Sequence, residues 1–96
     1  MNRDQVISLL VRKRVELERL GVKTLAVFGS TARNAASDAS DVDILVEFEG
    51  PATFDGYMDL KEFLEDLLGR PVDLVTRRAL KPAMKSDIEA EAVYVT

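Results

Sequence analysis

The chain has 96 residues, 47% of them hydrophobic and 31% charged, with a net charge of −4 at neutral pH, which gives one globular domain over residues 1–96 and no room for a second. The acidic balance argues against a general nucleic-acid-binding surface, so we expect no direct binding to nucleic acid. With no cysteine and no histidine, disulfides, thiolate nucleophiles, Ser-His-Asp catalysis and metal sites built on those residues are excluded, and acid–base chemistry falls to carboxylates or lysine.

The first predicted element is a helix over residues 2–20. Asn2 and Gln5 are spaced as a capping pair, and Gly21 follows as a C-terminal stop. Its apolar residues recur at helical spacing: Val6, Leu9, Leu10, Leu17 and Leu20. This is the pattern of a helix packed on a sheet, and we assign it no chemistry.

A short apolar run over residues 24–28 predicts a strand that is buried on both faces. The run ends at Gly29 and Ser30, after which the sequence Thr-Ala-Arg fits a short helix that starts at the turn. Residues 34–40 are small and polar, and this composition predicts a loop.

Residues 42–48 alternate in polarity, which predicts a strand with two different faces. One face carries the hydrophobic residues Val42, Ile44, Val46 and Phe48, and the other carries Asp41, Asp43, Leu45 and Glu47. Gly50 and Pro51 end this strand.

The rest of the chain alternates between helix and strand. An amphipathic helix that ends at Gly69 is marked by Leu60, Phe63, Leu64, Leu67 and Leu68. A brief strand over residues 72–75 and a weaker helix over residues 82–92 follow, and Tyr94 and Val95 form a last short strand or a tied-down tail. The alternation predicts an α/β (α+β) fold with helices packed against a small sheet.

Three aspartates are the candidate catalytic and metal-binding residues. Asp41 and Asp43 stand two apart on a predicted strand, so they point to the same side with alpha carbons roughly 6.5–7 Å apart. Oxygen ligands alone suit Mg²⁺, and the chain has no histidine or cysteine to offer instead. Asp73 interrupts the hydrophobic strand at residues 72–75, and it joins the pair if the two strands are neighbours and it faces the same way.

The turn at Gly29 and Ser30 is the candidate phosphate-binding site. A glycine at a strand end lets the backbone approach a phosphate closely, and a serine at a helix start offers N–H groups and a hydroxyl. Arg33, three residues after Ser30, shares its helix face and adds positive charge. A phosphate site opposite clustered carboxylates suits phosphoryl or nucleotidyl transfer, in which two metal ions stabilise the attacking and leaving oxygens.

Each of these features has a plain structural alternative, and only their combination is specific. A Gly-Ser pair is often an ordinary turn, and two aspartates on a strand often mark a solvated face. Asp38 is a rival to Asp41, but it lies in the predicted loop and lacks the alternating context. Leu45 fits core packing better than pocket lining, and Arg77 and Arg78 fit a solvated strand end better than a contact with a triphosphate or a partner.

Gly29-Ser30, a ten-residue gap and Asp41-x-Asp43 resemble the signature of the nucleotidyltransferase superfamily that includes DNA polymerase beta. The sequences GSTAR…SDVDILVEF and LGRPVDLVT resemble the minimal nucleotidyltransferases, or MNT domains, and the similarity covers essentially the whole chain. The resemblance implies the nucleotidyltransferase fold, a small mixed sheet with helices packed against it. It also implies a phosphate-binding role for Gly29 and Ser30, a metal-binding role for Asp41 and Asp43, and activation of the attacking hydroxyl by Asp73.

Two positions depart from the family pattern. Thr31 stands where arginine is frequent, and Asn34 stands where glycine is common. Asparagine tolerates a left-handed backbone better than most residues, so the turn can survive. The missing arginine removes one phosphate contact, which bears on affinity more than on catalytic competence.

The resemblance also implies a function. Stand-alone MNT proteins resemble the antitoxin half of HEPN/MNT toxin–antitoxin pairs. The implied activity is transfer of AMP from ATP, with two Mg²⁺ ions, to a tyrosine of a HEPN-domain ribonuclease toxin, with which the chain would form a hetero-oligomer. The small size is consistent with an acceptor that is another protein.

Two alternatives stay open. One is a nucleotidyltransferase that acts on a small molecule or RNA with a helper subunit, and the other is a non-catalytic antitoxin that acts by binding alone. The N-terminus carries no signal-peptide pattern, and no apolar run approaches the roughly 20 residues of a membrane span. We therefore expect a cytoplasmic protein that does not bind membranes.

Overall fold

A four-stranded sheet with the order β3-β2-β1-β4 organises the computed structural model, which describes residues 2–33 and 41–96. The strands are β1 (Val22–Val27), β2 (Val42–Phe48), β3 (Val72–Thr76) and β4 (Val93–Tyr94). β2 pairs antiparallel with β1 and parallel with β3, while β4 pairs antiparallel with β1. The sheet is therefore mixed, and the predicted α/β fold with helices against a small sheet is confirmed.

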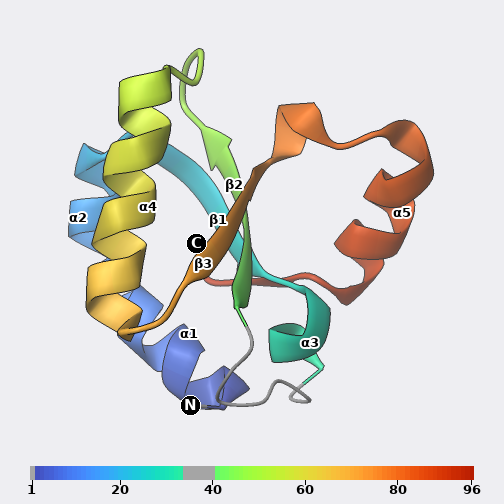
Figure 1. Cartoon of the computed structure of the whole chain (residues 1–96), viewed down its shortest axis with the longest axis horizontal. Helices are drawn as coiled ribbons and strands as arrows, with labels where there is room; N and C mark the ends of the chain where they lie inside the picture. Colours follow the sequence, from blue (N-terminus) through green and yellow to red (C-terminus); the bar gives the residue numbers. More distant parts are fainter. Residues whose placement is uncertain (1, 34–40) are drawn as a thin grey trace.

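Helices cover both faces of this sheet (Figure 1). One face is covered by α1 (Arg3–Arg12), α2 (Arg14–Arg19) and α4 (Phe54–Leu68). On the other face lies α5 (Pro82–Glu91), preceded by the short 3₁₀ helix η1 (Arg77–Ala79). The short helix α3 (Gly29–Ala32) follows the end of β1, and the C-terminal end of α5 comes close to it (Figure 1).

Buried residues form one cluster between the sheet and the helices on each of its two faces. The main core, under α1, α2 and α4, contains Leu10, Leu17, Ile44, Leu60 and Leu64, all with 1% exposure or less. The second core, under α5, is smaller and consists of Ala26, Phe28 and Leu45, against which Ile88 and three other partly buried residues pack. Both faces of β1 are thus buried near its end, as predicted, and Leu45 is a core residue, as predicted.

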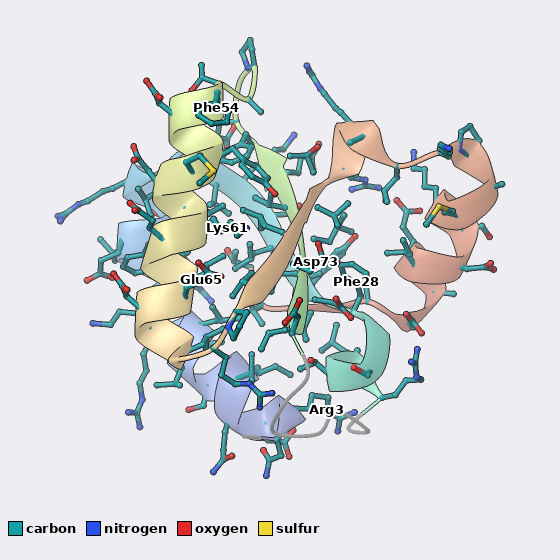
Figure 2. All side chains as sticks on the ribbon, viewed as in Figure 1. Arg3, Phe28, Phe54, Lys61, Glu65 and Asp73 are labelled. Atoms are coloured by element: carbon teal, nitrogen blue, oxygen red, sulfur yellow. The ribbon has the colours of Figure 1, made fainter. Side chains whose placement is uncertain are left out.

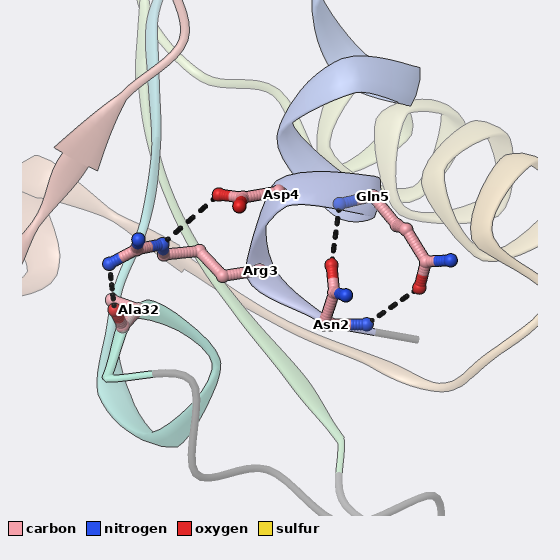
Figure 3. Close-up of polar contacts among 5 residues, drawn as sticks. All are labelled: Asn2, Arg3, Asp4, Gln5 and Ala32. Carbon is pink, nitrogen blue, oxygen red and sulfur yellow. Dashed lines mark hydrogen bonds and ion pairs between the residues drawn. The ribbon is translucent and has the colours of Figure 1, made fainter.

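The first helix begins as the sequence predicts but does not run to residue 20. Figure 3 shows the capping box: Asn2 Oδ1 accepts the Gln5 backbone N–H and Gln5 Oε1 accepts the Asn2 N–H, both at 2.9 Å. The single helix over residues 2–20 is wrong, because the chain breaks into α1 and α2 at Lys13, with φ −104° and ψ 20°. The apolar stripe lapses there, since a lysine and an arginine fill the turn between Leu10 and Leu17, so no core contact holds that turn in the helix.

α4 is bounded by a cap at each end and is tied to β3. Thr53 Oγ1 accepts the Gly56 N–H at its start, and Gly69, with φ 66°, ends it in the left-handed region, as predicted. The Tyr57 hydroxyl donates to the Leu74 carbonyl at 2.5 Å, and Glu65 Oε2 accepts the Val72 N–H at 2.9 Å. These contacts attach β3 to α4 on either side of Asp73 and so help to fix the position of that residue.

The C-terminal segment closes the open side of β1. β4 follows α5 after the single residue Ala92, and Val95 beyond it is buried in the main core. The Val95 N–H donates to the Leu25 carbonyl at 2.8 Å. The predicted last strand is therefore present, and it fixes the end of α5 against the sheet.

In residues 2–33 and 41–96, no helix is both long enough and apolar enough to cross a membrane.

Candidate active site

The pairing of β2 with β3 brings two of the predicted aspartates together. Asp43 and Asp73 are partners in the parallel register. Their neighbours along each strand, such as Ile44 and Leu74, are buried in the main core, so the two carboxylates project from the opposite face. Figure 2 shows Asp73 on β3, on the side of the sheet away from α4. Asp41 directly precedes β2 and is exposed.

Nearby charges and partial burial disfavour the ionised form of Asp43. The pKa of Asp43 is raised above its ordinary value, and its partial burial is the largest cause. The negative charges of Asp73, Asp41 and Glu91 raise this pKa further, in that order, whereas the positive charge of Arg33 lowers it. The site therefore concentrates negative charge around one half-buried carboxylate.

This donor set suits a hard divalent cation. It offers oxygen ligands alone, and a cation would relieve the repulsion that raises the pKa of Asp43. Across the two described ranges, no three acidic side chains already converge closely enough to hold a metal ion.

Gly29 lies directly against the Asp43 carboxylate. Its φ of 65° is in the left-handed region, and a Cβ built there would fall on Asp43 Oδ2 and lie only 3.0 Å from Asp43 Cγ. The backbone before it is held by a 3.0 Å bond from the Phe28 N–H to the Asp43 carbonyl. The predicted phosphate turn and the predicted carboxylates are thus neighbours, although 13 residues lie between Gly29 and Asp43 in the sequence.

The remaining predicted binding residues lie in and just after α3. Ser30 is half-buried in this helix, and Arg33 follows its last residue. Thr31, which stands where the family pattern often has arginine, is buried at 3% exposure, and the described residues offer its hydroxyl no hydrogen-bond partner. Asn34 and the rival Asp38 lie outside the described residues.

Glu91 is the site residue that the sequence did not reveal. Its Oε1 accepts the Gly29 backbone N–H at 2.9 Å, and its Oε2 accepts a bond from Arg33 Nη1 at 2.7 Å. It is the last residue of α5 and comes from a part of the sequence about 60 residues away from both partners. No local pattern could have linked it to the turn, because only the tertiary fold brings α5 beside α3.

A separate cavity of about 260 Å³ lies at the opposite end of β2. It is lined in part by Glu47, Arg78 and Lys85, and none of the predicted site residues borders it. Arg77 also lines it and forms ion pairs with Glu47 at 3.6 Å and with Glu89 at 2.8 Å. The geometry thus distinguishes this hollow from the carboxylate site.

Comparison with known sequences identifies related enzymes along nearly the whole chain. The pattern of the nucleotidyltransferase domain family matches residues 9–95. The protein adenylyltransferase MntA of Thermococcus cleftensis is 43% identical over 93 residues, which cover 96% of this chain and 94% of that protein. A Methanocaldococcus jannaschii protein assigned to the protein adenylyltransferases is 44% identical over 84 residues, or 86% of each chain.

Comparison with solved structures gives the same fold. A structure assigned to a minimal nucleotidyltransferase superposes with a TM-score of 0.86 at 35% identity and covers 97% of this chain and 95% of that one. A toxin–antitoxin structure with AMP-PNP superposes with a TM-score of 0.74 at 20% identity, covering 100% of this chain and 73% of that one. At 20% identity, the comparison with the toxin–antitoxin structure shows a shared fold and no more.

Proposed function

The chain belongs to the nucleotidyltransferase domain family, and on that premise we propose that it is a Mg²⁺-dependent protein adenylyltransferase that transfers AMP from ATP to a tyrosine of a HEPN-domain toxin. The observation that carries this proposal is the register of β2 and β3, which pairs Asp43 with Asp73 next to the Gly29 turn. Nucleotidyl transfer requires carboxylates that bind metal ions on one side of the nucleotide and hydrogen-bond donors to its phosphates on the other.

Each predicted residue has a defined role in this proposal. The triphosphate accepts hydrogen bonds from the Gly29 N–H, the Ser30 hydroxyl and the Arg33 guanidinium. Asp41, Asp43 and Asp73 would hold Mg²⁺, and two such ions would stabilise negative charge on the attacking and leaving oxygens. The chain spans residues 1–96 as one catalytic domain and leaves the acceptor to its partner.

The reaction forms one bond and breaks one. The tyrosine oxygen attacks the α-phosphorus of ATP, the bond from that phosphorus to the bridging oxygen breaks, and pyrophosphate leaves with its electron pair. Asp73 is more exposed than its strand partner Asp43, and it takes the proton of the tyrosine hydroxyl. The product is a phosphodiester between AMP and the tyrosine.

The choice of a protein acceptor rests on named relatives. The Thermococcus cleftensis relative is named a protein adenylyltransferase. A structural neighbour at 19% identity and a TM-score of 0.68 is a tri-AMPylated Shewanella oneidensis HEPN toxin in complex with its MNT antitoxin. The net charge of −4 also suits association with a basic ribonuclease. These relatives support a nucleotidyltransferase antitoxin that works on, and assembles with, a toxin.

The test is to incubate the chain with the protein encoded by the neighbouring gene, Mg²⁺ and ATP, and to weigh that protein. We expect a mass gain of one or more AMP groups on tyrosine, and at least about a hundredfold slower gain with Asp41→Asn, because each 1.4 kcal/mol of lost stabilisation is tenfold in rate. Asp59→Asn, an exposed aspartate on α4, is the matched control and should match the wild type.

Two results would contradict the proposal. If the chain neutralised its partner equally well with Asp41, Asp43 and Asp73 all replaced, and no mass gain appeared, it would act by binding alone. If the label from ATP appeared on RNA or on a small molecule and not on protein, the acceptor would be wrong and the transfer chemistry would stand.

A further inference from the structure

One carboxylate occupies two of the three donors that the proposed function assigns to phosphate. The two oxygens of Glu91 accept separate bonds, one from the Gly29 N–H at 2.9 Å and one from Arg33 Nη1 at 2.7 Å. A backbone N–H and a guanidinium that converge on one anion form a two-point anion site. In this structure the anion in that site is part of the protein.

The position of Glu91 is electrostatically unfavourable apart from these two contacts. Its negative charge lies close enough to Asp43 to oppose ionisation of that carboxyl, so it adds to a site that already holds three aspartates. Its side chain is 31% exposed and makes no contribution to either buried cluster. The contacts with Gly29 and Arg33 are therefore what holds the carboxylate there.

Glu91 also lies on a helix that contributes little to the core. No residue of α5 is fully buried, and its apolar contact with the sheet comes through Ile88. Glu89, two residues before Glu91, pairs with Arg77 at 2.8 Å. The two glutamates in the last turn of α5 therefore bind arginines from different segments. Glu91 itself belongs to neither buried cluster, so its carboxylate can leave the turn without the loss of a core residue.

We propose that Glu91 is an internal competitor of the nucleotide, which occupies the anion site formed by the Gly29 N–H and the Arg33 guanidinium and leaves it when a phosphate binds. The inference rests on the proposed function, because that function assigns these donors to phosphate. A site that is blocked part of the time binds more weakly in proportion to the fraction that is open. Glu91 therefore sets the nucleotide affinity without touching the transferred group.

The test measures binding of two probes by calorimetry. Tripolyphosphate in EDTA tests the anion site without metal or adenosine, and AMP-PNP with Mg²⁺ tests the complete site. If Glu91 occupies the anion site in about four of every five protein molecules, Glu91→Ala should bind each probe about fivefold more tightly than the wild type. Glu91→Gln, which keeps the shape and loses the charge, should also bind more tightly and guards against a folding defect in the alanine variant.

Glu89→Ala is the matched control, since it removes an equal charge from the same turn of α5. Equal tightening in Glu89→Ala and Glu91→Ala would reduce the effect to net charge and overturn the inference. Weaker or unchanged binding in both Glu91 variants, or no binding of tripolyphosphate by any variant, would overturn it as well.

The same variants separate this inference from the proposed function. Tighter binding of tripolyphosphate by Glu91→Ala, with no AMP transfer by the wild type, supports the competitor and contradicts the transferase. AMP transfer that depends on Asp41, with Glu91→Ala no tighter than Glu89→Ala, supports the transferase and contradicts the competitor.

Discussion

At the scale of single residues, the site is built from groups that oppose folding. Asp43 is a half-buried carboxylate among like charges, and Gly29 holds a left-handed backbone against it. Neither group stabilises the domain by itself, and both fit the proposed site, which would bind a cation and a phosphate. Strain of this kind at a functional site is usually offset by the rest of the fold.

Asp43→Asn should stabilise the metal-free protein at neutral pH. Because the folded pKa of Asp43 is raised, the folded chain holds this proton more tightly than the unfolded chain does. The resulting stabilisation is fully present below the unfolded pKa and is lost as the pH rises through the folded pKa. At pH 7 the charged Asp43 thus opposes folding, and asparagine removes that opposition.

Thermal unfolding in EDTA measures this effect. We expect a midpoint a few degrees above the wild type at pH 7, since 1 kcal/mol shifts a domain of this size by roughly 4–8 °C, and a smaller difference toward pH 4. Added Mg²⁺ should stabilise the wild type more than the variant. A lower midpoint for Asp43→Asn at pH 7 without metal would count against the electrostatic account.

Gly29→Ala should reduce AMP transfer by about tenfold or more, because the new methyl group displaces the Asp43 carboxylate or the turn. Gly69→Ala is the matched control: its φ of 66° gives the same backbone strain, and no atom lies within 4 Å of the added carbon. Transfer rates measured with saturating partner should fall for Gly29→Ala and hold for Gly69→Ala. Equal rates in the two variants would show that the contact with Asp43 is unimportant.

At the scale of elements, each segment near the site is fixed by a contact at its end. Arg3 at the start of α1 donates to the Ala32 carbonyl at the end of α3 at 3.3 Å (Figure 3). Tyr57 and Glu65 of α4 hold β3. The carboxylates and the predicted phosphate turn are therefore positioned by helices that contribute no predicted catalytic group.

The left-handed end of α4 gives a prediction at this scale. Gly69→Ala should lower the free energy of unfolding by about 1 kcal/mol, because a side chain at φ 66° is strained even where space is open. Gly50→Ala, also in open space but without a positive φ, should leave stability nearly unchanged. Urea unfolding of the two variants measures the difference, and an equal loss in both would contradict the assignment of the cost to backbone conformation.

At the scale of the whole molecule, local patterns predicted the elements and long-range pairing decided the site. The alternation in residues 42–48 placed Asp43 and Leu45 on one face, and the Gly29 turn ended a strand, because these features depend on neighbouring residues. The pairing of Asp43 with Asp73 depends on the β2–β3 register, which the sequence left as a condition. The break at Lys13 and the contact of Glu91 depend on how helices pack, so neither was predicted.

The short strand β4 gives the Glu91 contact its strength. Val93 pairs with Val27, two residues before Gly29, and only Ala92 separates Glu91 from this strand. The carboxylate is thus tethered within reach of the turn, and a short tether gives a weak ligand a local concentration on the order of millimolar. Under the proposed competition a nucleotide has to displace a carboxylate held at that local concentration, so we expect the pairing of β4 with β1 to set the ATP concentration at which the site fills.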